Sequence, residues 1–348
     1  MHLLRWSFRH ACAAALAGIA SISATASAGE VFSSLASQPS GRISFTSVTP
    51  KNLYALHKHA GEQPTAVVNA TLYLPEDVRK PVPAMVITPG SGGIMTNQTE
   101  RWAPLFLKLG VAVLLVDTLG SRHIESTVSD QAQLSYAADV ADSFYALNLL
   151  ATDPRIDPAR IGQIGFSRGG AIALDTLIEP FRAAVLPQST VRFAVHVAVY
   201  AACDDTYWNG KASLVADAPV LFLMAEKDEA VSNALCLAYA AKLKAILPRV
   251  ETRVYEGAHH DFDAVESRRV WISKGINNRS CPGREFDPTD WSVTDLPSGR
   301  RYATFAEYAK AFPDYCGKRG YTIEGHPAAA RQAEQDVAAF LRATLNLP

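Results

Sequence analysis

The sequence predicts an α/β fold, in which a mostly parallel, twisted β-sheet carries helices on both faces. Two observations support this prediction. Short, continuously apolar runs such as 111–117 recur along the chain, and such runs are typical of parallel strands buried on both faces. Segments with helical periodicity, such as 130–150, lie between these runs. Strands that alternate with helices in this way build sheets covered by helices on both sides.

In the first half of the chain we expect strands at 43–48, 66–74, 84–88 and 111–117, and helices at 100–109 and 130–150. Proline and glycine mark where these elements end. Pro75 ends the second strand, because proline has no N–H group to donate to a strand ladder. Gly110 ends the first helix, and the glycine-rich stretch 89–93 closes the third strand.

In the second half we expect strands at 161–166, 191–200, 219–225 and 249–255, and helices from 168 onward, at 231–247 and at 327–345. Pro248 stops the middle helix. The last helix is amphipathic, with Ala333, Val337 and Phe340 on one side. Its apolar side should therefore pack on the sheet.

Residues 264–325 interrupt the alternation. Prolines and glycines punctuate this segment, and it contains the aromatic residues Trp271, Phe286, Trp291 and Tyr302. Long irregular segments of compact domains usually cover functional sites or are disordered. The aromatic residues and two cysteines favour an ordered cover. We therefore expect 29–348 to form one domain with an irregular insertion at about 264–325.

The first 28 residues resemble an export signal. Arg5 and Arg9 give a basic start, an apolar run at 11–20 is too short to span a bilayer, and small residues precede position 29. We expect cleavage after Ala28 and a protein exported to the periplasm or the extracellular space, with no membrane attachment after cleavage. The alternatives are an N-terminal anchor helix or a buried helix.

The overall composition is that of an ordinary globular protein. Of the 348 residues, 48% are hydrophobic and 19% are charged, and the formal net charge is −1. This charge, with no basic block in the chain, argues against nucleic acid as a partner.

The cysteines fit an oxidising compartment. One cysteine lies in the predicted signal, which leaves Cys203, Cys236, Cys281 and Cys316. Four cysteines allow three pairings, and sequence does not rank them firmly. We favour Cys203–Cys236, which joins a strand end to the helix after the next strand, and Cys281–Cys316, which closes the insertion. The alternative is four free, buried thiols.

A short motif at the end of one apolar strand carries the strongest chemical signal. Residues 165–169 read Gly-Phe-Ser-Arg-Gly, which matches the nucleophile elbow G-x-S-x-G. In such an elbow Ser167 occupies strained backbone, and glycines two positions away avoid collisions with the turn. The following helix would point its N–H groups at the serine, where negative charge develops during acyl transfer. Ser167 is therefore the candidate nucleophile.

A serine nucleophile needs a base, and the base needs a group that holds its tautomer. Two strands that follow Ser167 end in suitable residues, the first in the run Glu226-Lys227-Asp228-Glu229 and the second in the pair His259-His260. Both lie at strand C-terminal ends, the edge where open sheets place their sites. Rivals for the acid are Asp204 and Asp205, after the preceding strand, and more weakly Glu226.

Three stretches together resemble the dienelactone hydrolase family of α/β-hydrolases: 165–170, 225–228 and 255–263. The resemblance covers about 65–262 and 320–345 and leaves the insertion outside. The family pattern Y-x-G-A-x-H-x-F implies His260 as the base, with His259 at the variable position, and it implies Asp228 as the acid. Dienelactone hydrolase itself uses a cysteine nucleophile, so Ser167 favours a generic ester over dienelactone.

The oxyanion hole of such an enzyme needs two N–H groups. We expect them from Arg168, after the nucleophile, and from Ser91, in the glycine-rich turn 89–93. A phosphate-cradling loop is disfavoured because no Lys-Ser/Thr follows this turn. Residues 259–263 resemble metal ligands, but no second ligand group is evident elsewhere. We therefore expect no metal and no cofactor.

Arg122 and His123 follow the strand at 111–117. They are equally compatible with the mouth of the pocket and with a solvated loop.

The predicted function is an exported serine hydrolase that cleaves small carboxylic esters through Ser167, His260 and Asp228. The same machinery would also serve thioester or peptide hydrolysis, because a triad does not select the leaving group. A non-catalytic binding protein that kept the fold is the remaining alternative.

Overall fold

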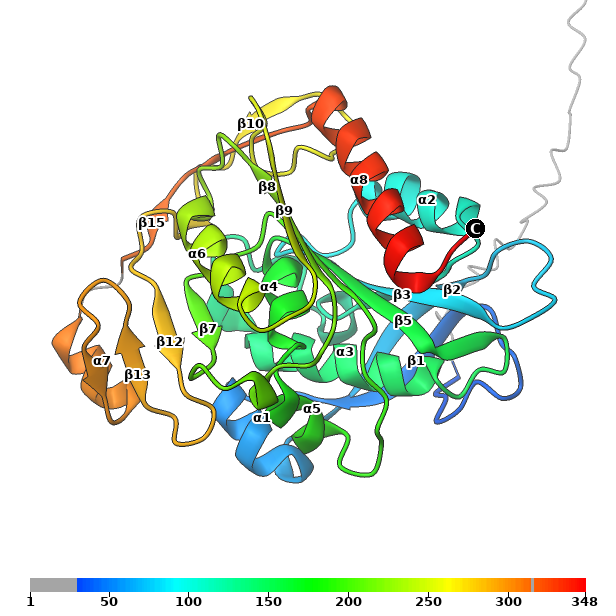
Figure 1. Cartoon of the computed structure of the whole chain (residues 1–348), viewed down its shortest axis with the longest axis horizontal. Coiled ribbons are helices and arrows are strands. Elements are labelled where there is room, and N and C mark those ends of the chain that lie inside the picture. The colour runs from blue at the N-terminus through cyan, green and yellow to red at the C-terminus, as the bar shows by residue number, and fades with distance from the viewer. Residues whose placement is uncertain (1–29, 314–315) are drawn as a thin grey trace, which may run out of the picture.

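The computed structural model describes residues 30–313 and 316–348, so the predicted signal peptide and its cleavage site lie outside the described residues. An eight-stranded sheet forms the centre, in the order β1-β2-β4-β3-β5-β6-β8-β9 (Figure 1). Only β2 runs antiparallel to its neighbours β1 and β4, and the other neighbouring strands of this sheet are parallel. The strands are β1 (Gly41–Val48), β2 (Thr65–Tyr73), β3 (Val82–Thr88), β4 (Ala112–Asp117), β5 (Ile156–Phe166), β6 (His196–Val199), β8 (Val220–Ala225) and β9 (Val250–Tyr255).

Helices cover both faces of this sheet, which confirms the predicted fold class. Successive residues of a strand point to opposite faces, so Val86 of β3 packs in one core and its neighbours Met85 and Ile87 in the other. The first core lies under α1 (Leu53–His59), α3 (Tyr136–Leu150), α4 (Arg168–Asp175), α5 (Glu179–Val185) and α6 (Asn233–Lys244). The second lies under α2 (Ala103–Lys108) and α8 (Pro327–Leu345), which pass side by side (Figure 1).

Every strand and helix predicted outside the insertion has a counterpart, with ends shifted by a few residues. The predicted helix 100–109 divides into a π-helical turn, Asn97–Trp102, and α2. The helices α1 and α5 were not predicted. Both have seven residues, too few for a periodic pattern to stand out.

The insertion is more regular than expected. A second sheet contains three strands of the insertion, β12 (Arg284–Phe286), β13 (Val293–Asp295) and β14 (Arg301–Tyr302). Its fourth strand is β7 (Asp205–Tyr207), which comes before the insertion in the sequence. Together with α7 (Phe305–Ala311), this sheet stands at the left edge of Figure 1. Two further pairs join β10 (Arg269–Trp271) to β16 (Thr322–Glu324) and β11 (Ile276–Asn277) to β15 (Lys318–Arg319). Strands of two or three residues are too short to show alternation, so sequence reasoning missed them.

Two disulfides tie this arrangement together. Cys203, which follows β6, is bonded to Cys236 of α6, and Cys281 is bonded to Cys316 across the insertion. These are the pairs that the sequence favours.

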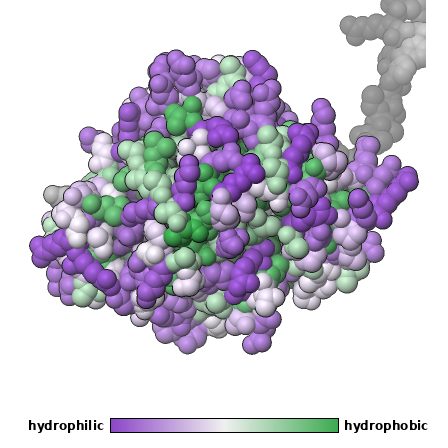
Figure 2. Space-filling model, in the orientation of Figure 1, coloured by the Kyte–Doolittle hydropathy of each residue, from purple (hydrophilic) through white to green (hydrophobic). Residues whose placement is uncertain are grey.

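Charged and polar side chains surround a central group of apolar residues on the face shown in Figure 2.

Candidate active site

Ser167 stands at a sharp turn between β5 and α4. Its backbone has φ 53° and ψ −113°, a strained region for a residue with a side chain. The surrounding glycines have a steric reason. A Cβ atom on Gly165 would lie 1.8 Å from the carbonyl oxygen of Gly169, and one on Gly169 would lie 2.1 Å from the carbonyl oxygen of Thr88. The chain can therefore make this turn only with glycine at both positions.

Ser167, His260 and Asp228 form one hydrogen-bonded row. The Nε2 atom of His260 lies 2.9 Å from the Oγ atom of Ser167, and its Nδ1 atom lies 2.8 Å from Oδ2 of Asp228. The other oxygen of Asp228 accepts hydrogen bonds from the N–H groups of Ala230 and Val231, at 2.8 and 3.1 Å. With the ring hydrogen on Nδ1, the free Nε2 atom can accept the proton of the Ser167 hydroxyl.

Asp228 also controls the charge of His260. Burial acts to lower the pKa of His260, but the negative charge of Asp228 and its hydrogen bond outweigh burial and raise this pKa from 6.5 to about 9. His260 serves as a base only in its neutral form, whose fraction grows as pH rises through this pKa.

We therefore expect kcat/KM for ester hydrolysis to rise by about tenfold per pH unit on the acidic side and to level off near pH 9. Background-corrected initial rates between pH 5 and 10 measure this profile. His259→Gln is the matched control and should leave the profile in place. A profile that is flat from pH 6 to 9, or that moves with His259→Gln, would contradict the assignment of His260.

Ser91 and Arg168, the two predicted oxyanion donors, both lie next to Ser167. Ser91 lines the same cavity as Ser167. The turn that carries it packs tightly, since a Cβ atom on Gly90 would lie 3.4 Å from Cβ of Ser167. Arg168 is the first residue of α4, where its N–H group has no partner within the helix.

Sequence reasoning missed Gln131, which links the side chains of these two residues. Its Nε2 atom donates to Oγ of Ser91 at 2.9 Å, and its Oε1 atom accepts from Nη1 of Arg168 at 3.1 Å. The Arg168 side chain is itself only 1% exposed and is held by Asp139 at 2.6 Å. Gln131 thereby ties the glycine-rich turn to the start of α4. No signal in the sequence distinguishes this glutamine from others.

A buried carboxylate supports the His260 loop from behind. Asp263 accepts hydrogen bonds from Asn97 (2.9 Å), Trp102 (2.6 Å) and Tyr200 (2.7 Å). The ring of Tyr200 lies 4.7 Å from that of His260. The sequence indicated Asp263 only as a member of the group 259–263, which resembles a set of metal ligands. Among residues 30–313 and 316–348, no group of three or more potential ligands is arranged to hold a metal ion.

The rival acids do not contact His260. Asp205 forms a two-pronged ion pair with Arg284, at 2.6 and 2.7 Å. Asp204 lines a different cavity, and Glu226 accepts from the N–H group of Gly257 at 2.8 Å.

His259, the rival base, and Arg122 and His123, which follow β4, also lie outside the hydrogen-bonded row of Ser167, His260 and Asp228. His259 faces Glu324, with Nε2 3.8 Å from the carboxylate. Arg122 binds Asp142 at 2.8 Å instead of reaching the pocket mouth, and neither Arg122 nor His123 lines the cavity at Ser167.

The cavity at Ser167 has a volume of about 170 Å³. The insertion forms part of its wall through Ile272, Tyr321 and Ile323. The ordered cover predicted from the aromatic residues and cysteines of the insertion therefore borders the candidate site.

Comparison with known proteins identifies the family. The sequence profile of the dienelactone hydrolase family matches residues 68–280. Lipase 1 of Moraxella sp. (strain TA144) is 28% identical over 205 residues, which are 56% of this chain and 56% of the lipase. This chain thus spans about half the length of that lipase.

Solved structures of Thermogutta terrifontis esterase 2 are also similar. The propionate-bound form is 19% identical, with a TM-score of 0.45 over 56% of this chain and 80% of the esterase. The butyrate-bound form is 19% identical, with a TM-score of 0.45 over 60% and 84%. Because the family profile matches more than half of its residues, this chain belongs to the dienelactone hydrolase family, with an α/β-hydrolase fold.

Proposed function

We propose that this protein hydrolyses small carboxylic esters through an acyl-enzyme on Ser167. The observation that carries the proposal is the continuous hydrogen-bonded row from Asp228 through His260 to Ser167. Membership of the dienelactone hydrolase family supports the same reaction class. No step needs a group beyond the side chains, the backbone and water.

In the first half of the reaction, Oγ of Ser167 attacks the ester carbonyl carbon while Nε2 of His260 takes the hydroxyl proton. The resulting oxyanion accepts hydrogen bonds from the N–H groups of Arg168 and Ser91. Asp228 stabilises the positive charge that forms on His260. The oxyanion then collapses, the carbon–oxygen bond to the alcohol breaks, and His260 returns the proton to the departing alkoxide.

In the second half, His260 removes a proton from water, which attacks the acyl carbon bound to Ser167. The second oxyanion then collapses, the bond between the acyl carbon and Oγ of Ser167 breaks, and His260 returns its proton to Oγ, which releases the carboxylic acid and restores the serine hydroxyl. The cavity of about 170 Å³ is smaller than the ~300–1,000 Å³ of pockets for drug-sized ligands. This size supports short acyl groups as the substrates.

The test is labelling of the full chain with a fluorophosphonate, followed by mass mapping of the adduct. We expect one adduct, on Ser167, and faster turnover of p-nitrophenyl acetate and butyrate than of p-nitrophenyl octanoate. If the folded protein takes no label and cleaves none of these esters, the hydrolase proposal is wrong, and a binding role would replace it.

We also propose that the protein is exported and works in an oxidising compartment, as a periplasmic or extracellular enzyme. Two disulfides support this, because such bonds persist outside the reducing cytosol. No helix within residues 30–313 and 316–348 has the length and apolar character needed to cross a bilayer. N-terminal sequencing of protein recovered outside the cytoplasm should begin at Gly29, and a retained leader would contradict the cleavage.

A further inference from the structure

Two adjoining cavities lie outside the catalytic row, which is the hydrogen-bonded row of Ser167, His260 and Asp228. The smaller is lined by Ala171 and Asp175 of α4, and the larger by no residue of that helix. The smaller has a volume of about 270 Å³ and the larger about 600 Å³. Asn52, Leu53, Asp205 and Tyr207 belong to the walls of both, so the two cavities are neighbours, and together they are called the joined cavity below. Neither cavity is lined by a member of the catalytic row.

Asp175, the last residue of α4, lines the smaller cavity without a partner. Its side chain belongs to a residue that is only 7% exposed, and within the described parts of the chain it makes no hydrogen bond or ion pair. Burial and the nearby charge of Asp205 hold the pKa of Asp175 well above its usual range. No donor or cation of the described residues occupies this carboxyl group, so a cationic ligand that enters the cavity can reach it.

The smaller cavity has an excess of acidic groups. Asp204 and Asp205 also line it, and its partly exposed cation, Arg284, is already committed to Asp205 through two hydrogen bonds. Asp204 accepts one hydrogen bond from Asn278 at 3.2 Å but pairs with no cation among the described residues. Lys51 lies exposed at the rim. Asp175 and Asp204 therefore form no ion pair of their own among the described residues, although the charge of Arg284 acts to lower the pKa of Asp204.

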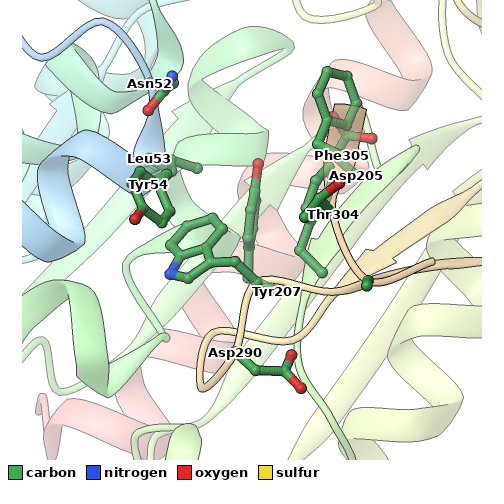
Figure 3. Close-up of a pocket in the computed structure, with 11 residues that line it drawn as sticks. Asn52, Leu53, Tyr54, Asp205, Tyr207, Asp290, Thr304 and Phe305 are labelled. Atoms are coloured by element: carbon green, nitrogen blue, oxygen red, sulfur yellow. The ribbon is translucent and has the colours of Figure 1, made fainter. Parts of the chain in front are cut away.

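Five of the eleven residues that line the larger cavity are aromatic. Tyr54, Tyr207 and Phe305 come from three distant parts of the chain and stand around the same hollow (Figure 3). The ring of Tyr54 packs edge-on against Trp291 at 5.3 Å, and that of Tyr207 stacks on Phe286 at 5.2 Å. Faces of aromatic rings attract cations as well as apolar groups.

We propose that this joined cavity binds an organic ammonium compound. The ammonium group pairs with Asp175 and Asp204 in the smaller part, and the apolar body lies among the aromatic rings of the larger part. A metal ion is disfavoured, because no cluster of three potential metal ligands exists among residues 30–313 and 316–348. Because its raised pKa favours the protonated form in the free protein, Asp175 gives up its proton to the solvent when the ammonium group binds. The site does not depend on the proposed esterase activity.

The test is calorimetric titration of the full chain with 2-phenylethylammonium, beside 2-phenylethanol and phenylacetate as neutral and anionic analogues. We expect the ammonium compound to bind at least about tenfold more tightly than the alcohol, and phenylacetate not to bind. Asp175→Asn should weaken ammonium binding by about tenfold to a hundredfold. Asp217→Asn, which removes an exposed acid that lines a different hollow, should leave the affinity unchanged.

Tyr54→Ala provides a second variant that does not disturb the core, since Tyr54 is 49% exposed. It should weaken binding by about threefold to tenfold, through loss of ring contact, and it decides the question if Asp175→Asn does not fold. Equal affinity for the ammonium compound and the alcohol would overturn the proposal. So would ammonium binding that survives both substitutions, or that disappears when Ser167 carries a fluorophosphonate.

Ester turnover of the same preparations separates the two proposals. Asp175→Asn should keep wild-type turnover while it loses ammonium binding. A protein that binds the ammonium compound but cleaves no ester would refute only the esterase.

Discussion

Ser167→Ala should lower kcat for p-nitrophenyl butyrate by about 10⁴- to 10⁶-fold, with little change in KM. Alanine removes the Oγ atom on which the proposed acyl-enzyme forms, and His260 then has no hydroxyl proton to accept. Substrate binding should persist, because the cavity wall changes by a single oxygen atom. Initial rates of the purified variant, together with loss of the fluorophosphonate adduct, measure this effect.

The matched control is Ser213→Ala, which alters an exposed serine of the 3₁₀ turn Ala212–Leu214. This variant should retain wild-type kcat and labelling. If Ser167→Ala kept more than about a hundredth of the wild-type kcat, the nucleophile would have to be another residue.

Gly169→Ala should prevent stable folding or remove most of the free energy of unfolding. The added Cβ atom would lie 2.1 Å from the carbonyl oxygen of Thr88 and 2.5 Å from that of Pro89. Both atoms belong to the backbone where β3 ends, so neither can rotate away. Substitutions that strain a packed backbone in this way cost more than about 4 kcal/mol, against a total stability of about 5–15 kcal/mol. Denaturant unfolding of the purified variant measures the loss.

Gly61→Ala is the control for this substitution. Gly61 lies in an exposed 3₁₀ turn, and a Cβ atom there would meet nothing within 4 Å. The free energy of unfolding should change by less than about 1 kcal/mol. Wild-type stability of Gly169→Ala would mean that the elbow does not pack against the end of β3 as described.

The sequence alone determined the sheet and the candidate nucleophile, because both depend on local patterns. Continuous apolar runs specify strands buried on both faces, so β4 and β8 were evident without structural information. The glycines around Ser167 likewise reflect a steric demand within one turn of the chain. The family resemblance added His260 and Asp228, whose motifs are also short and contiguous.

Only the tertiary structure decided between groups that are distant in sequence. It placed Asp228, and not Asp204 or Asp205, against His260, because that choice depends on how far each loop extends beyond its strand. It also brought Gln131 to Ser91 and left the Asp175 side chain without a partner among residues 30–313 and 316–348, and no periodic pattern in the sequence records either outcome. Local patterns report which side of an element is buried, whereas hydrogen-bond partners depend on the packing of segments separated by tens of residues.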